Sequence, residues 1–103
     1  NASGNWSPFY AIGLLSADSG SDRLDPGNWH KAQEPVFSHS EANGVFSPGN
    51  IAFLPSADSS EMYFIYHGRH IPNQAPCTPR LQKLKWTDRG MPVLGTPLPL
   101  HTV

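Results

Sequence analysis

Proline and glycine recur along the whole chain, and they limit its possible folds more than any other feature. Eleven Pro and nine Gly occur among 103 residues. Proline removes a backbone donor and clashes inside a helix, and glycine carries an entropic cost there. The sequence therefore predicts strands and turns.

Four short runs between residues 44 and 95 have the composition of strands joined by hairpin loops. The runs IAFL (51–54) and EMYFIYH (61–67) flank PSADSS, and RLQKLKW (80–86) precedes the turn TDRG. A Pro-punctuated edge segment, MPVLGTPLPL, follows. This pattern fits one antiparallel propeller blade, or half of a β-sandwich. A lone blade exposes two apolar faces and would need neighbours.

Three further stretches carry local predictions. FYAIGLL (9–15) reads as a buried strand, and Trp29 and Val36-Phe37 read as apolar anchors around a polar bend. SPGN (47–50) reads as a turn before a strand. In 61–67, alternate side chains face opposite ways and both sets are largely apolar, which predicts a strand between two layers.

Charge and hydrophobic length exclude two kinds of partner. The net charge is −1 and 15% of residues are charged, so no basic field is available for nucleic acid or an anionic membrane. No apolar run approaches the roughly 20 residues that span a bilayer. We therefore expect neither nucleic acid nor a membrane as a partner.

The N-terminal region and the lone cysteine bear on the compartment. Asn1 and Asn5 each begin an N-glycosylation triplet, which suggests a secreted glycoprotein. Cys77 has no intrachain disulfide partner and no metal-type spacing around it. It is either a free thiol or half of a bridge to a segment outside this chain.

The acidic residues lie in polar surroundings. Five Asp occur in Ser-, Gly- or Pro-rich turns, Glu34 precedes a proline, Glu41 is in a polar loop and Glu61 begins a strand. A carboxyl group that acts as a general acid near neutral pH needs a pKa raised by burial in apolar surroundings. None of the acidic residues lies inside an apolar run, so we expect no catalytic residue in this chain.

An ordered set of motifs resembles the C-terminal part of the family-43 glycoside hydrolases, which comprise arabinanases, α-L-arabinofuranosidases and β-xylosidases. The stretches YAIGLL, NWHKAQEPVF, GVFSPGNIAF, MYFIYHGR and PRLQKLKWTDRGMPVLGTPLP follow in order over nearly the whole chain. The more specific positions are Trp29, Lys31, Pro35, Val36, Phe37, Tyr66, His67, Arg80, Gln82, Trp86, Gly90 and Pro92.

The resemblance implies an all-β fold, a five-bladed β-propeller of which this chain is the last one to two blades. Residues 1–43 would then be the end of the penultimate blade and its connecting loop. Residues 44–103 would form the last blade and the closing segment. The family's three catalytic carboxylates lie in earlier blades, so a complementary N-terminal part would carry them.

Asn50 occupies the position where the resemblance implies a histidine that points into the central tunnel. Asn can donate and accept hydrogen bonds but cannot titrate near neutral pH. An axial calcium or sodium ion is therefore disfavoured, and we expect no cofactor and no metal. The alternative role for Asn50 is that of an ordinary turn residue.

Three more residues are candidates for substrate binding through the resemblance. Arg80 matches an arginine that reaches the sugar or a catalytic carboxylate, although a surface arginine before a strand is also common. His67 matches a last-blade histidine, with a histidine bonded within the sheet as its alternative. Trp6 matches an aromatic residue near the sugar, with a lid over the core as its alternative.

The interpretation is a C-terminal segment of a secreted, inverting glycoside hydrolase that acts on arabinan, arabinoxylan or xylan side chains of plant cell walls. This chain would supply pocket wall and would be inactive alone. The alternative is a stand-alone carbohydrate-binding or structural β domain, with Trp6, Trp29 and Trp86 as a stacking platform. A nicked enzyme with two associated pieces is a third possibility.

Overall fold

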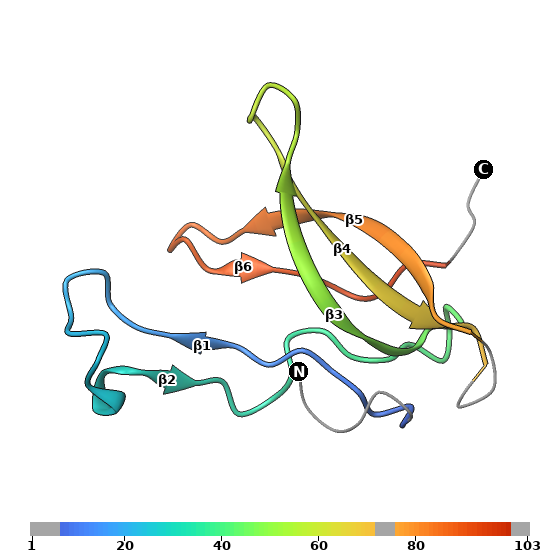
Figure 1. Ribbon diagram of the computed structural model, residues 1–103, viewed down its shortest axis with the longest axis horizontal. Coiled ribbons are helices and arrows are strands. Elements are labelled where there is room, and N and C mark those ends of the chain that lie inside the picture. Colours follow the sequence, from blue (N-terminus) through green and yellow to red (C-terminus); the bar gives the residue numbers. More distant parts are fainter. Residues whose placement is uncertain (1–6, 72–75, 100–103) are drawn as a thin grey trace.

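The computed structural model describes residues 7–71 and 76–99. These residues form two antiparallel β-sheets and one short 3-10 helix (Figure 1). The first sheet pairs β1 (Leu15–Ser16) with β2 (His30–Lys31), and the helix η1 (Pro26–Asn28) precedes β2. The second sheet has the order β3-β4-β5-β6. Its strands are β3 (Phe46–Pro55), β4 (Met62–Arg69), β5 (Thr78–Trp86) and β6 (Pro92–Val93).

The four-stranded sheet is a meander in which each strand pairs with the next one along the chain. Its first hairpin is closed by Asp58, whose carboxylate accepts hydrogen bonds from the Ser56 hydroxyl and from the backbone N–H and hydroxyl of Ser60. Its last hairpin turns at Gly90, which has a φ of 79°. The strands and the hairpins predicted between residues 51 and 95 are confirmed. The fold is all-β, and the four-stranded sheet is curled, as in a propeller blade (Figure 1).

The SPGN stretch lies inside β3 and is not a separate turn before it, so this local prediction was wrong. Ser47 and Asn50 have φ angles of 53° and 55°, and the register with β4 shifts on both sides of Gly49. Left-handed backbone angles are typical of turns, and the residue types that favour them are the reason why SPGN predicts a turn. In the structure they form bulges that bend a continuous strand.

The core lies between the four-stranded sheet and the N-terminal half of the chain. Phe37 is 1% exposed, and its ring packs edge-on against Phe64 and Tyr66 of β4, at centroid distances of 5.3 and 4.8 Å. The buried side chains around them belong to Ile12, Val45, Leu84 and Leu94. The anchoring role predicted for Val36-Phe37 is therefore confirmed.

The run 9–15 is only partly buried, which corrects the prediction of a buried strand there. Ala11 and Ile12 are buried, whereas Phe9 and Leu15 are 67% and 62% exposed. Ile12 forms only an isolated bridge with Phe37, through a 2.9 Å hydrogen bond from its backbone N–H. The described residues therefore leave the side chains of Phe9 and Leu15 largely uncovered.

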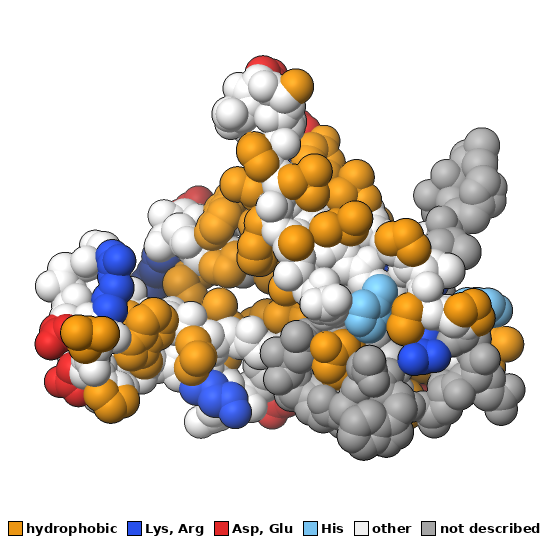
Figure 2. All heavy atoms as spheres, viewed as in Figure 1, with side chains coloured by type: hydrophobic (Ala, Val, Ile, Leu, Met, Phe, Trp, Pro, Cys, Tyr) orange, Lys and Arg blue, Asp and Glu red, His pale blue; other side chains and the backbone are white. Residues whose placement is uncertain are grey.

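The other face of the four-stranded sheet is left open by the described residues. The cross-strand partners Ala52, Ile65 and Leu81 share this face, and Leu54 and Tyr63 extend it toward the first hairpin. Ile65, Leu54 and Leu81 are 40%, 40% and 57% exposed. We call these five residues the open face. Figure 2 shows hydrophobic side chains gathered over β3 and β4. No helix in the described part of the chain is long and apolar enough to cross a membrane.

Candidate functional site

Two of the predicted site residues, Asn50 and His67, line one shallow cavity of about 280 Å³. Its other lining residues are Ile65, Tyr66, Cys77 and Pro79. Asn50 lies in the irregular part of β3 directly after Gly49, which is the cross-strand partner of His67. The sequence thus predicted two residues that the fold brings together from different strands.

The ring of Tyr10 stacks on the imidazole ring of His67. The two rings are stacked at an interplanar angle of 10°, with their centroids 5.8 Å apart. Burial, and then the charge of Arg69, lowers the pKa of His67 below its ordinary value. The imidazole is therefore neutral at pH 7, with one nitrogen able to donate a hydrogen bond and the other able to accept one.

Arg80 lies in a second cavity, of about 190 Å³, which shares Tyr66 and Pro79 with the first. Arg80 is the cross-strand partner of Tyr66 and is only 7% exposed. Its guanidinium nitrogens Nε, Nη1 and Nη2 are buried and have no hydrogen-bond partner among the described residues. A buried charge without a partner costs several kcal/mol in typical proteins, on the order of the cost of breaking a buried ion pair. The alternative prediction, that Arg80 is an ordinary surface arginine before a strand, is therefore wrong.

The backbone of β4 leaves room for this guanidinium. Arg80 runs past Gly68, where an added Cβ would approach Arg80 Nε to 3.0 Å and Val45 Cγ1 to 3.1 Å. Glycine at this position lets the arginine lie close against the neighbouring strand. The side-chain position of Arg80 is therefore set by the fold.

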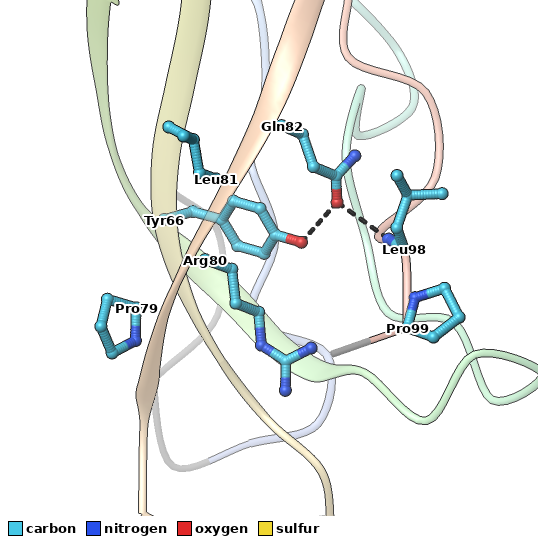
Figure 3. A pocket seen from close by; sticks show the side chains of 7 residues that line it. All are labelled: Tyr66, Pro79, Arg80, Leu81, Gln82, Leu98 and Pro99. Atoms are coloured by element: carbon cyan, nitrogen blue, oxygen red, sulfur yellow. Dashed lines mark hydrogen bonds between the residues drawn. The ribbon is translucent and has the colours of Figure 1, made fainter. Parts of the chain in front are cut away.

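Gln82 joins the wall of the Arg80 cavity to the segment after β6 (Figure 3). Its Oε1 accepts hydrogen bonds from the Tyr66 hydroxyl at 2.5 Å and from the Leu98 backbone N–H at 2.8 Å. Its Nε2 donates to the Thr96 carbonyl oxygen at 3.3 Å. Burial raises the pKa of Tyr66 to about 12, with Arg80 opposing that shift, so the phenol stays a neutral donor.

Sequence reasoning missed Tyr66, which lines both cavities, and Tyr10, which stacks on His67. The sequence presents Tyr66 only as an apolar strand residue and as part of a motif. Its signal was available in the strand alternation, which puts Tyr66 on the same face as Phe64. Tyr10 gave no such signal, because its contact with β3 and β4 joins distant parts of the sequence. Trp6, Asn1 and Asn5 lie outside the described residues.

All eight acidic residues of the chain lie in the described ranges, and none is buried. The pKa of Asp58 is lowered to about 2 by the hydrogen bonds from Ser60 and Ser56. The pKa of Glu61 is lowered by its hydrogen bonds from Lys83 and Tyr63. A general acid in sugar cleavage needs the opposite shift, which burial in an apolar pocket produces.

Candidate metal ligands are also few. Across residues 7–71 and 76–99, no group of three or more His, Cys, Asp or Glu side chains is arranged to hold a metal ion. His67 and Cys77 are the two residues of these types that line the cavity beside Asn50, and Cys77 is a free, exposed cysteine.

Comparison with known proteins identifies the relatives of this chain. It is 37% identical over 98 residues to α-L-arabinofuranosidase B of Pyricularia oryzae. It is 35% identical over 96 residues to the extracellular exo-α-(1→5)-L-arabinofuranosidase of Streptomyces avermitilis. These alignments cover 87% and 86% of this chain but 20% of each relative. No family model matches the chain.

Solved structures agree with the sequence relatives. An α-L-arabinofuranosidase from Lactobacillus brevis superimposes with a TM-score of 0.84 at 26% identity, over 94% of this chain and 33% of that one. A thermostable family-43 glycoside hydrolase superimposes with a TM-score of 0.70 at 27% identity, over 98% and 33%.

The relatives found by sequence and by structure are glycoside hydrolases. The chain is related to the α-L-arabinofuranosidases of glycoside hydrolase family 43 and matches their C-terminal part. It spans about one fifth of the length of the sequence relatives and one third of the solved chains. The resemblance inferred from the motifs and the all-β fold are both confirmed.

Proposed function

We propose that this chain is a wall segment of a secreted, inverting α-L-arabinofuranosidase whose catalytic carboxylates lie in the rest of the polypeptide. The observation that carries this proposal is the match to arabinofuranosidases over nearly the whole chain but only a fraction of their length. The exposed carboxyl groups of this chain support it, because a general acid with a raised pKa has to come from elsewhere.

Arg80, Asn50 and His67 supply the chemistry of the wall in this proposal. A guanidinium offers five donors in a fixed plane, which suits sugar hydroxyls or a carboxylate that faces them. The burial of Arg80 without a partner among the described residues supports such a role, since a ligand oxygen would satisfy it. Asn50 and a neutral His67 line the neighbouring cavity, and each could both donate a hydrogen bond to the ligand and accept one from it. Trp6, outside the described residues, remains a candidate for stacking on the sugar.

The division of the chain follows the same proposal. Residues 1–43 would complete the penultimate blade, and residues 44–103 would form the last blade of a five-bladed propeller. The β1–β2 pair and the β3–β6 sheet support this division, because no strand of one sheet pairs with a strand of the other in the described ranges. The complementary N-terminal part would cover the open face.

A stand-alone binding domain is disfavoured by the open face. Ile65, Leu54 and Leu81 lie together on one side of the sheet, and such contiguous apolar surface normally marks a contact with another layer. A stand-alone domain would place this surface in water at a cost of about 25 cal/mol for each Å².

Two relatives from Streptomyces are named extracellular enzymes, which supports secretion of this protein. The N-glycosylation triplets that begin at Asn1 and Asn5 support glycosylation. The substrate class would be arabinan, arabinoxylan or xylan side chains. The test is to express the complete protein and to follow release of arabinose from 4-nitrophenyl α-L-arabinofuranoside and from branched arabinan, with the anomer identified by NMR. Release of β-arabinose first supports an inverting arabinofuranosidase. Absence of hydrolysis of either substrate by folded protein would overturn the proposal.

A further inference from the structure

Tyr10 contacts the four-stranded sheet at Gly49, a strand residue that has no side chain. A Cβ added to Gly49 would come to 2.0, 2.5 and 2.8 Å from three carbon atoms of the Tyr10 ring. Real contacts of this kind are not shorter than 3.0 Å. The ring therefore lies directly on the backbone of Gly49, and any side chain there would displace it.

The same ring continues onto His67. Gly49 and His67 are cross-strand partners, so a ring that covers the glycine reaches the side chain of the histidine next to it. The nearly parallel arrangement, at 10° and 5.8 Å, is the offset stacking that aromatic pairs favour. The glycine of the bulge thus makes room for an aromatic contact that fixes the plane of the imidazole.

We propose that Tyr10 is a positioning residue, which holds the His67 imidazole in the orientation that contacts the ligand in the cavity beside Asn50. A neutral imidazole has one donor and one acceptor, and both lie in the ring plane. The plane therefore decides which ligand hydroxyl the ring can reach. The identity of the ligand in this inference rests on the proposed function. The contact between Tyr10 and His67 is independent of that function.

The groups around His67 make this contact measurable. Arg69 lies two residues further along β4, and its charge favours the neutral imidazole, as burial does. Loss of the covering ring would admit water, weaken the desolvation and raise the pKa of His67 toward its ordinary value of about 6.5. The Tyr10 ring also shifts the His67 proton resonances by its ring current.

The experiment compares Tyr10→Phe with Tyr10→Leu in the complete protein. The Phe variant keeps the ring and is the matched control, whereas the Leu variant removes the ring and leaves part of its space to water. His67 is followed by NMR in protein with labelled histidine, with its signal assigned by the His67→Gln variant. Gly49→Ala is the second route to the same defect, because it displaces the ring without changing it.

We expect Tyr10→Phe to match the parent protein. We expect Tyr10→Leu and Gly49→Ala to raise the pKa of His67 and to move its ring proton signals downfield. In hydrolysis of 4-nitrophenyl α-L-arabinofuranoside they should raise KM about 2- to 10-fold, which corresponds to the usual strength of an aromatic pair, and change kcat less.

Each contrary result overturns a different statement. Unchanged His67 signals in folded Tyr10→Leu would overturn the positioning role, whatever the activity. Shifted signals with unchanged KM would overturn the contact between His67 and the ligand. Shifted signals in a complete protein that hydrolyses no arabinofuranoside would support the positioning contact while overturning the proposed function.

Discussion

Phe37 lies edge-on against Phe64, with the ring planes at 87°, and this contact joins the N-terminal half of the chain to the four-stranded sheet. Both rings are almost completely buried. We expect Phe37→Ala in the complete protein to lower the free energy of unfolding by about 3–5 kcal/mol, because it leaves a cavity in the core. Denaturant unfolding measures this change.

Leu24→Ala is the control for this prediction. Leu24 is 92% exposed, so its truncation should change the free energy of unfolding by less than about 0.5 kcal/mol. Equal effects of the two substitutions would show that Phe37 does not join the two parts.

Replacement of Arg80 by methionine should separate activity from stability. The variant loses the charged donors of the pocket wall, and we expect kcat/KM for an arabinofuranoside to fall about 10- to 100-fold, the value of one strong hydrogen bond to a charged group. The guanidinium is buried without a partner among the described residues, and if the ligand alone satisfies it in the complete protein, the melting temperature without ligand should stay unchanged or rise.

Arg89→Met is the matched control for Arg80→Met, since Arg89 is exposed in the turn between β5 and β6. It should leave both activity and melting temperature unchanged. A large fall in melting temperature for Arg80→Met, without a specific loss of activity in the remaining folded protein, would assign Arg80 a structural role.

His67 should make stability depend on pH. Its pKa is lowered in the folded protein, so the unfolded chain takes up a proton first as the pH falls through about 6.5. The contribution of the neutral, packed imidazole is therefore present above that pH and is lost below it.

Melting temperatures between pH 8 and pH 5 test this dependence. The parent protein should lose more stability over this range than His67→Gln does, whereas His30→Gln, at an exposed position in β2, should follow the parent. If His67→Gln follows the parent curve, the imidazole is not held neutral by the fold.

The open face should be covered in the complete protein. Leu81→Glu would then place a carboxylate between two layers, and we expect a loss of at least about 2 kcal/mol in the free energy of unfolding. Lys85→Gln, on the same strand and exposed, should change it by less than about 0.5 kcal/mol. Equal, small effects would leave the open face in water.

Much of the four-stranded sheet could be predicted from the sequence because its signals are local. The alternation in 61–67 and the turn residues in PSADSS and TDRG suffice to place two hairpins. The bulges around Gly49 could not be predicted, because the residues of a bulge and of a turn share the same left-handed backbone.

The candidate site was predictable only in part. Asn50 and His67 were found through their motifs, and the structure brings them to one cavity. The depth of Arg80 was not predictable, since arginine is seldom buried and nothing next to it in sequence indicates burial. Tyr10 was missed because its contacts with Gly49 and His67 depend on how distant segments pack.

The central claim is that this chain supplies wall and no carboxyl group to the cleavage of the glycosidic bond. Amide substitution of each of its acidic residues, one at a time in the complete protein, tests it most directly. The substitutions are Asp18→Asn, Asp22→Asn, Asp25→Asn, Glu34→Gln, Glu41→Gln, Asp58→Asn, Glu61→Gln and Asp88→Asn. We expect every variant to keep kcat for an aryl arabinofuranoside within about threefold of the parent, since removing a general acid or base costs about 100-fold or more. A folded variant whose kcat falls by that larger factor would contradict the account.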